Sequence, residues 1–291
     1  MAADMPTLRF GLPKGHMQEA VFRLLADAGI HVRVGSRAYR PSVTYPGVEA
    51  KILKPQNIVE MLHAGSRDIG FAGADWVEEL DLGGELVELL DTGLDPVRVV
   101  AAAPTELLEE GRLPERPLVV ASEYTRLTEQ WLTESGIEAT LIHSYGATEV
   151  FPPEDADLIV DNTATGSTLR ANGLEIVAEL MNSSTRLYAS RALMEDGDRK
   201  EEAERIVLLL KSVLEARRRV MVEVNVDPSR LESVIEVLPC MREPTVSTLH
   251  GQSGFAVKAA VPREDLIRVI PEIKARGGTD VVVTTLSQIV P

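Results

Sequence analysis

Short apolar segments alternate with segments of helical periodicity along the first two thirds of the chain, and this alternation constrains the fold most strongly. A typical unit is the apolar run Leu118–Ser122, followed by helical spacing over Thr125–Ser135 and by Gly136, a residue that favours a helix C-terminus. Alternation at this spacing predicts an α/β fold with mostly parallel sheets and helices on both faces. Further strand candidates are Thr7–Leu12, Glu49–Leu53, Asp68–Ala72, Val97–Ala103, Glu138–His143 and Asp157–Asp161.

The alternating part of the chain extends to about Asp198, which is long for a single sheet. We therefore expect two α/β lobes with a cleft between them and a boundary near Leu94–Val97. Val97–Ala103 is almost purely apolar, as a strand buried on both faces should be. Asn57 is placed to cap the helix that follows the strand Glu49–Leu53.

The last part of the chain has a different pattern. A long helix is expected over Arg199–Arg219, and after it Pro271 is expected to kink or break a later helix. The order β-α-β-β-α-β predicts a separate ferredoxin-like domain. Its expected elements are Val220–Val226, Ser229–Leu238, Thr245–Leu249, Phe255–Val261, Asp265–Arg276 and Val281–Leu286.

Charge and composition exclude several classes of partner. The 291-residue chain has a formal net charge of −15, which disfavours nucleic acid and anionic membranes and requires any phosphate site to be a local exception. Cys240 is the only cysteine, so no intrachain disulfide can form. Met1–Leu8 lacks the apolar core of a secretory signal, and no apolar run approaches the roughly 20 residues needed to span a membrane. These features predict a cytoplasmic protein.

The segment from Asp157 to Gly173 carries the clearest chemical pattern. An apolar strand ends in Asp161, and a loop of hydroxyl residues around Gly166 leads into a short helix. Hydroxyl groups, a glycine and the N–H groups at a helix start suit a phosphate, and Asp161 suits sugar hydroxyls. The alternative is that Ser167 only caps a helix and Asp161 only ends a strand.

The segment Ala156–Leu174, ADLIVDNTATGSTLRANGL, resembles the phosphoribosyl pyrophosphate loop of the ATP phosphoribosyltransferases, which open histidine biosynthesis. The resemblance implies a two-lobed catalytic core like the type II periplasmic binding proteins, followed by a ferredoxin-like (ACT-like) regulatory domain that binds histidine. The following segments resemble other parts of the family's long form: Leu12–Gly15, Leu53–Ile58, Asp68–Asp75, Ala121–Tyr124, Pro239–Leu249 and Phe255–Val261.

The resemblance also implies a role for individual residues. It places residues 1–95 with about 180–215 in one catalytic lobe, 96–179 in the other, and 216–291 in the regulatory domain. ATP and phosphoribosyl pyrophosphate are the implied substrates, with Mg²⁺ held through their phosphates, histidine as inhibitor, and a homo-oligomer, dimer to hexamer, as the assembly. The implied catalytic residues are Lys14, Asp161 and Arg98; the substrate-binding residues are Asp157, Thr163, Thr165, Gly166, Ser167, Thr168, Leu169, Lys54, Gly73, Asp75 and Tyr124; and the histidine-binding residues are Glu223, Thr245 and Ser247.

Each role has a structural alternative. Lys14 alone in a loop is more often solvated, Arg98 would otherwise pair with an acid, and Asp75 would be a first-turn helix acid. The five histidines have no metal-ligand spacing. A second hypothesis is a sensor or altered-substrate paralogue that binds a nucleotide or amino acid without turnover. It rests on three departures from the family, since His16 and Lys54 stand where many members have arginine and Asn57 stands where they have aspartate.

Overall fold

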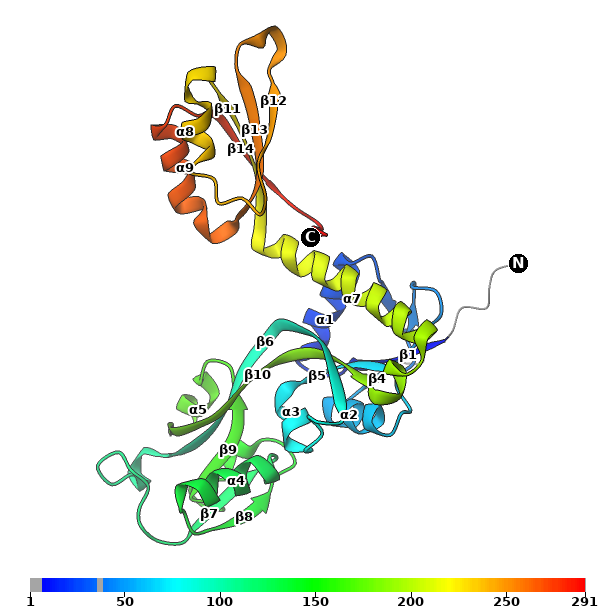
Figure 1. Ribbon diagram of the computed structural model, residues 1–291. Coiled ribbons are helices and arrows are strands. Elements are labelled where there is room, and N and C mark those ends of the chain that lie inside the picture. The colour runs from blue at the N-terminus through cyan, green and yellow to red at the C-terminus, as the bar shows by residue number, and fades with distance from the viewer. Residues whose placement is uncertain (1–6, 36–38, 291) are drawn as a thin grey trace. The chain divides into compact units, whose positions relative to one another are not determined.

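The computed structural model describes residues 7–35 and 39–290. It divides into two compact units, one formed by Met1–Arg23 with Ile30–Glu204 and the other by Leu24–Gly29 with Arg205–Pro291. The first unit has the α/β class predicted for this part of the chain (Figure 1). Among the described residues, no helix has the length and apolar character needed to cross a membrane.

The first unit is built on one mixed sheet of eight strands. From edge to edge the strand order is β4-β1-β5-β10-β6-β9-β7-β8. A separate two-stranded sheet joins β2, Val32–Arg33, to β3, Ser42–Val43. The bounds in the large sheet are β1 Leu8–Pro13, β4 Val48–Leu53, β5 Ile69–Gly73, β6 Leu86–Pro104, β7 Leu118–Ser122, β8 Ala139–His143, β9 Leu158–Thr163 and β10 Leu174–Ser190.

The two ends of this sheet are parallel and its centre is antiparallel. Strand β1 pairs in parallel with β4 and β5, and β7 does so with β8 and β9. The long strands β6 and β10 lie between these groups and run antiparallel to each other and to their outer neighbours. The carboxyl ends of two parallel groups therefore flank the central ribbon, and loops at such ends commonly bind ligands.

The central ribbon is longer than the sequence pattern indicated. Only Val97–Ala103 was predicted within β6, and β10 was not predicted (Figure 1). The pairing of β6 with β10 contains five register shifts, four of them between Glu179 and Tyr188. Three of the shifts, those between Ile176 and Thr185, skip a residue of β10 and so interrupt the two-residue alternation by which a strand is recognised. The pattern of Leu174–Ser190 therefore does not read as one strand.

The helices of the first unit connect and cover the strands. Helix α4, Thr125–Ser135, has the predicted bounds, and Gly136 ends it in the left-handed region with φ 67°. The prediction that Asn57 caps a helix is wrong, because α2 begins at Pro55 with Lys54 at its N-cap, and Asn57 bonds to Glu60 inside the helix.

The other helices are α1 Met17–Asp27, α3 Ala74–Glu79, α5 Ser167–Ala171, α6 Arg191–Met194 and α7 Gly197–Arg218, with 3-10 turns at Thr105–Leu107 and Thr148–Val150. Helices α1 and α7 continue into the second unit.

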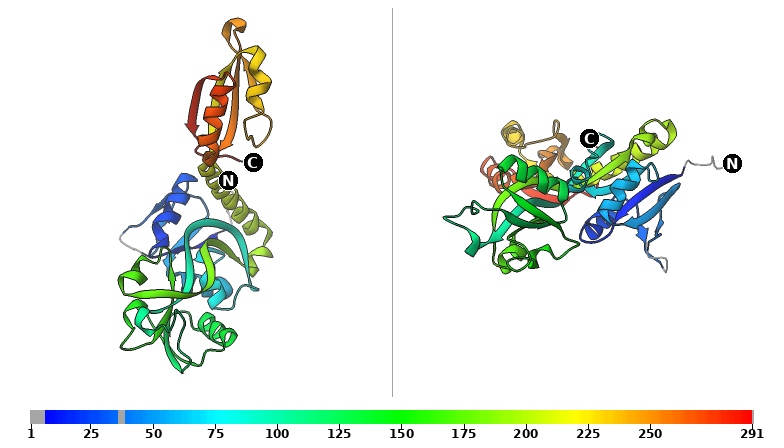
Figure 2. Two further views of the ribbon diagram at one scale, coloured as in Figure 1. Left: turned by 90° about the vertical axis from the view of Figure 1, so that its left-hand side faces the viewer. Right: turned by 90° about the horizontal axis from the view of Figure 1, so that it is seen from below.

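The second unit contains the predicted ferredoxin-like domain. Its four strands form an antiparallel sheet in the order β12-β13-β11-β14. Helices α8 and α9 lie on the same face of this sheet (Figures 1 and 2), where the core contains Val222, Val224 and Val257. The bounds are β11 Arg219–Val226, α8 Leu231–Ile235, β12 Thr245–Thr248, β13 Phe255–Pro262, α9 Leu266–Ala275 and β14 Thr279–Thr285, with 3-10 turns at Pro228–Arg230, His250–Gln252 and Arg263–Asp265.

Pro271 was expected to kink or break the second helix; it does not break it, because α9 runs through it. Proline removes one backbone hydrogen bond and crowds the preceding turn. Val269 and Ile273, both fully buried on either side of Pro271, hold the helix against the sheet. Tertiary packing therefore outweighs the local cost.

Candidate functional site

The loop after β9 is held by its own hydroxyl groups. The backbone N–H of Gly166 donates to Thr163 Oγ1 at 2.9 Å, and Thr165 Oγ1 donates to Ser167 Oγ at 3.0 Å. Gly166 has φ 71° and is the N-cap residue of α5, with no side-chain cap. Ser167 is therefore not a cap, and the alternative given for it is wrong. Leu169 is buried and anchors the short helix in the core.

This loop lines a cavity of about 490 Å³, which is within the usual size range of small-molecule sites. The cavity contains Asp161 and most of the loop that follows it. Four other segments complete the lining; they contribute His16, then Val97, then Glu123, then Gly146, Thr148 and Glu149. The structure thus brings Asp161, Thr163, Thr165, Ser167, Thr168 and Leu169 of the predicted set together.

Asp161 has a perturbed carboxyl group. Burial raises its pKa to about 6, and the nearby carboxylates of Glu123 and Glu149 add to the rise. Hydrogen bonds from the Asn162 N–H, at 2.7 Å, and from Thr148 oppose it. An anionic oxygen held in an apolar and acidic environment favours a cation, a sugar hydroxyl or a positively charged sugar ring.

Lys14 and Lys54 lie beside each other at the carboxyl ends of β1 and β4. The two strands are parallel, with Pro13 opposite Leu53, and the Lys14 N–H donates to the Leu53 carbonyl at 2.8 Å. Lys14 Nζ donates to the Tyr39 hydroxyl at 3.2 Å and lies 5.0 Å from the ring centroid. In residues 7–35 and 39–290 no carboxylate forms an ion pair with either lysine, so both charges are available to an anion.

Asp75 and Tyr124, predicted to bind substrate, are buried and contact each other. The Tyr124 hydroxyl donates to Asp75 Oδ2 at 2.6 Å, and Asn162 Nδ2 donates to the same hydroxyl at 2.9 Å. Ser183 Oγ donates to Asp75 Oδ1 at 2.7 Å. Burial and the Asp75 charge raise the Tyr124 pKa well above its ordinary value, so the phenol stays protonated and donates.

Gly73 ends β5 directly before this network. A Cβ atom on Gly73 would lie 2.0 Å from Asp75 Oδ1, so only glycine leaves room for the carboxylate. Gly73 and Asp75 also line a narrow extension of the cleft that His16, Val97 and Asn162 share with the larger cavity.

Arg98 lies opposite Thr163 in the pairing of β6 with β9. Its guanidinium pairs with Glu179 at 3.1 Å, and both side chains are more than one-third exposed. Such a pair contributes little to stability and is easily exchanged for another anion. Arg98 lines a second cavity of about 380 Å³ that adjoins the first at Val97 and Ala164.

Asp157 lies apart from these residues. It precedes β9, at the strand end opposite Asp161, and its carboxylate accepts bonds from Arg116 at 2.7 Å and from the Val119 N–H at 2.7 Å. The Arg116 guanidinium lowers the pKa of Asp157. Asp157 thus connects the start of β9 to β7, and it does not line the cavity.

The predicted histidine-binding residues share the sheet face of the second unit that α8 and α9 leave uncovered. Glu223 alternates with the core residues Val222 and Val224, so its side chain lies on the opposite face. The strand register places Thr245, Lys258 and Glu223 in one row, and Lys258 pairs with Glu223 at 2.6 Å. Ser247 lies in the next row, opposite Ala256.

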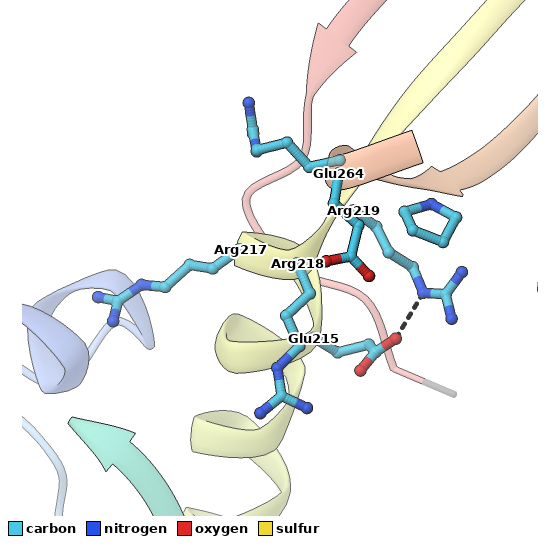
Figure 3. A pocket seen from close by; sticks show the side chains of 7 residues that line it. Glu215, Arg217, Arg218, Arg219 and Glu264 are labelled. Atoms are coloured by element: carbon cyan, nitrogen blue, oxygen red, sulfur yellow. Dashed lines mark hydrogen bonds and ion pairs between the residues drawn. The ribbon is translucent and has the colours of Figure 1, made fainter. Parts of the chain in front are cut away.

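A larger cavity, of about 640 Å³, lies in the second unit where α7 meets β11. Arg217, Arg218 and Arg219 border it, but their side chains point in three different directions (Figure 3). Arg217 pairs with Asp27 and Arg219 with Glu215. Since the guanidinium groups do not converge, this cavity lacks the geometry of an anion site.

Sequence reasoning missed several residues of the cleft. Thr148 and Glu149 line the cavity beside Asp161 but belong to a segment without a recognisable pattern. Glu123 also lines it and lies in the segment Ala121–Tyr124, in which only Tyr124 was given a role. Asn162 and Ser183 complete the buried network, and their partners are 38 and 108 residues away in the chain. Only Asn162 had a local indication, its position next to Asp161.

The described residues contain no group of three or more His, Cys, Asp or Glu side chains that could hold a metal ion. Glu123, Glu149 and Asp161 all line the cavity, but they do not form such a group. The donor set therefore fits a divalent cation that arrives with most of its ligands, such as phosphate oxygens, rather than one held by the protein alone.

Comparison with known proteins agrees with this geometry. The family model "HisG: ATP phosphoribosyltransferase" matches residues 54–212, and "HisG, C-terminal domain" matches residues 216–288. An ATP phosphoribosyltransferase of Pelotomaculum thermopropionicum is 35% identical over 98% of this chain and 99% of the relative. One of Desulforudis audaxviator is 36% identical over 98% of this chain and 99% of the relative.

A solved structure described as an ATP phosphoribosyl transferase (HisG:HisZ) complex from Thermotoga maritima shares the fold. Its TM-score is 0.62 at 24% identity, covering 70% of this chain and 99% of that chain. The resemblance noted in the sequence is confirmed, including the C-terminal domain of the long form. From these matches over nearly its whole length, the chain belongs to the ATP phosphoribosyltransferase family.

Proposed function

We propose that this protein transfers the 5-phosphoribosyl group of phosphoribosyl pyrophosphate to N1 of the adenine of ATP, releasing pyrophosphate, as the first step of histidine biosynthesis. The observation that carries the proposal is the cavity in which Asp161 faces the hydroxyl-rich loop Thr163–Thr168. A phosphoribosyl group needs both features, because its phosphate requires donors and its ring hydroxyls require an acceptor.

The residues around the cavity have different chemical roles. The hydroxyls of Thr165, Ser167 and Thr168 and the N–H groups near Gly166 bind the 5′-phosphate. Asp161 accepts hydrogen bonds from the ribose hydroxyls, and its negative charge stabilises the ring as the bond to pyrophosphate breaks and the anomeric carbon becomes electron-poor. Adenine N1 then attacks that carbon from the opposite face, so no covalent enzyme intermediate is required.

Lys14 and Lys54 stabilise the phosphate groups that carry most of the negative charge. Both cations follow parallel strands at the same edge of the sheet, and neither has an acid partner among the described residues. His16, two residues after Lys14, lines the cavity and so brings this loop to its border. Arg98 releases Glu179 to contact an anion in the adjoining cavity.

Mg²⁺ fits this site as a cation carried by the substrate, since the described residues offer too few ligands to hold it alone. When bound, it neutralises charge on the departing pyrophosphate. The protein supplies Asp161, Glu123 and Glu149 around the cavity, and these carboxylates favour a bound cation electrostatically.

The direct test follows pyrophosphate release, measured as phosphate after pyrophosphatase, with ATP, phosphoribosyl pyrophosphate and Mg²⁺ present. We expect a release that depends on both substrates. Binding of both without any release would overturn the proposal and favour a sensor or altered-substrate protein.

Lys14→Ala tests the role of the exposed lysine. Without its charge the pyrophosphate leaves less readily, so turnover should fall by more than about tenfold. Lys274→Ala, on α9 of the second unit, is the matched control and should turn over like the wild type. Equal rates for the two variants would remove Lys14 from the mechanism.

We further propose that histidine inhibits the enzyme by binding to the uncovered sheet face of the second unit. Glu223 and Lys258 offer one charge of each sign, as the ammonium and carboxylate of an amino acid require, and Thr245 and Ser247 add hydroxyls. A homo-oligomer of the long form and a cytoplasmic location are part of the same proposal, because family resemblance implies the first and ATP and phosphoribosyl pyrophosphate are intracellular metabolites.

A further inference from the structure

A buried chain of hydrogen bonds links the segments that follow β5 and β7, which belong to the two parallel groups of the eight-stranded sheet. It starts at Ser183 on β10, passes through Asp75 at the start of α3 and the hydroxyl of Tyr124, and ends at Asn162 on β9. The successive distances are 2.7, 2.6 and 2.9 Å. The Asp75 N–H also donates to Ser183 Oγ at 3.1 Å, which closes the network at its first member.

The two central members of this network are buried, so they offer little surface to a substrate. Tyr124 has no exposed surface and Asp75 is 4% exposed. The Tyr124 ring stacks on Trp76 with centroids 4.7 Å apart, which fixes the direction of its hydroxyl. Buried polar groups with satisfied geometry make a rigid arrangement, because breaking any one bond leaves an unpaired group in a medium of low polarity.

The network ends one residue from the predicted catalytic carboxylate. Asn162 uses its side-chain Nδ2 to bond Tyr124 and its backbone N–H to bond Asp161 Oδ1 at 2.7 Å. The residue whose backbone N–H holds the Asp161 carboxylate thus also has its side chain held by the Tyr124 hydroxyl. The bond from the Asn162 N–H also holds down the pKa of Asp161.

We propose that Tyr124 and Asp75 are positioning residues, which fix Asn162 and through it aim the Asp161 carboxylate at the ribose hydroxyls, rather than residues that bind the substrate themselves. The inference rests on the proposed function for the identity of the sugar. It also explains Gly73, because a side chain there would displace the Asp75 carboxylate from the network.

Tyr124→Phe removes one hydroxyl and keeps the ring on Trp76. A carboxylate misplaced by about 1 Å can lose on the order of 100-fold in rate, so we expect kcat/KM for phosphoribosyl pyrophosphate to fall 10- to 100-fold. Tyr45→Phe is the matched control, because Tyr45 also donates its hydroxyl to a carboxylate, that of the buried Glu202. Both variants lose one such bond, so a merely structural effect would be the same in both.

The pH profile distinguishes positioning from stability. Loosening Asn162 weakens the bond that holds the Asp161 pKa down, so the acid limb of kcat/KM should move to higher pH in Tyr124→Phe and stay in place in Tyr45→Phe. Identical profiles and identical kcat/KM for the two variants would overturn the proposal.

A second pair of variants decides the question if Tyr124→Phe does not fold. Asp75→Asn keeps an oxygen that accepts the Tyr124 hydroxyl, whereas Asp75→Ala does not. We expect Asn to retain phosphoribosyl pyrophosphate binding, measured by calorimetry without ATP, and Ala to weaken it about tenfold or more. Equal losses would exclude the positioning role. Wild-type turnover tests the proposed function separately, since these binding comparisons do not depend on it.

Discussion

At the scale of single residues, Asp161 links the site to solution pH. Its pKa of about 6 in the folded protein lies above the ordinary value of 3.8, so the ionised carboxylate is disfavoured by folding. The free energy of unfolding should therefore decrease as pH rises from about 4 to 6 and remain lower above that range. Asp161→Asn removes this penalty and should stabilise the protein by on the order of 1–3 kcal/mol at pH 8, with little difference near pH 4.

Urea unfolding at the two pH values measures this difference. Asp155→Asn, at a nearby exposed carboxylate, serves as the control and should not change the pH dependence. The same substitution at Asp161 should abolish turnover, since an amide carries no charge to stabilise the sugar ring. A variant that is less stable than the wild type at pH 8 would contradict the assignment of a disfavoured charge.

The same scale shows what sequence can and cannot indicate about a site. Asp161 and the loop around Gly166 were predictable because the strand end, the glycine and the hydroxyls are contiguous. Ser183 was not, because its role depends on Asp75, which lies 108 residues earlier in the chain. Asp157 shows the reverse failure. It belongs to the same motif and was predicted to bind substrate, but it lies at the other end of the strand from Asp161 and bonds to Arg116.

At the scale of elements, a side chain from α3 caps the N-terminus of α4. The N-cap residue of α4 is Tyr124, whose hydroxyl is already occupied, and it makes no side-chain cap bond. Glu79, the last residue of α3, accepts the N–H groups of Arg126 and Leu127, both at 3.0 Å. A carboxylate at this position also favours the positive end of the helix dipole.

Removing this cap should lower stability and loosen the attachment of α4. Glu79→Ala is expected to cost about 1–2 kcal/mol, because two N–H groups lose their acceptor. Thermal or urea unfolding gives the value, and Glu129→Ala, on the exposed side of the same helix, provides the control. A loss no larger than that of the control would show that water replaces the carboxylate.

Element prediction succeeded where one rule determined the structure. Helix α4 was predicted with correct bounds from its periodicity and Gly136, and the order of the last six elements was correct. Strand β10 was missed because its bulges disturb the alternation, and Pro271 was misjudged because packing of α9 overrides its local cost. In each failure, contacts made by distant residues outweighed the local pattern.

At the scale of the whole molecule, the chain carries two units with different kinds of surface for ligands. The first holds a concave cavity at the carboxyl ends of parallel strands, which suits a phosphorylated sugar. The second presents an open sheet face on which Lys258 and Glu223 pair across neighbouring strands. Both side chains are about half exposed, so a ligand can replace each partner at little cost.

This arrangement makes histidine sensitivity separable from turnover. Glu223→Gln removes the charge expected to bind the ammonium group, so the histidine concentration for half inhibition should increase by about tenfold or more. Turnover without histidine should stay close to that of the wild type, because Glu223 lies in the unit that does not contain Asp161. Glu232→Gln, on α8 and thus on the covered face, is the matched control and should keep normal inhibition. If both variants are inhibited like the wild type, histidine binds elsewhere, and the row of Thr245, Lys258 and Glu223 is only an exposed strand face. Loss of turnover in Glu223→Gln alone would instead mean that the second unit supports catalysis directly.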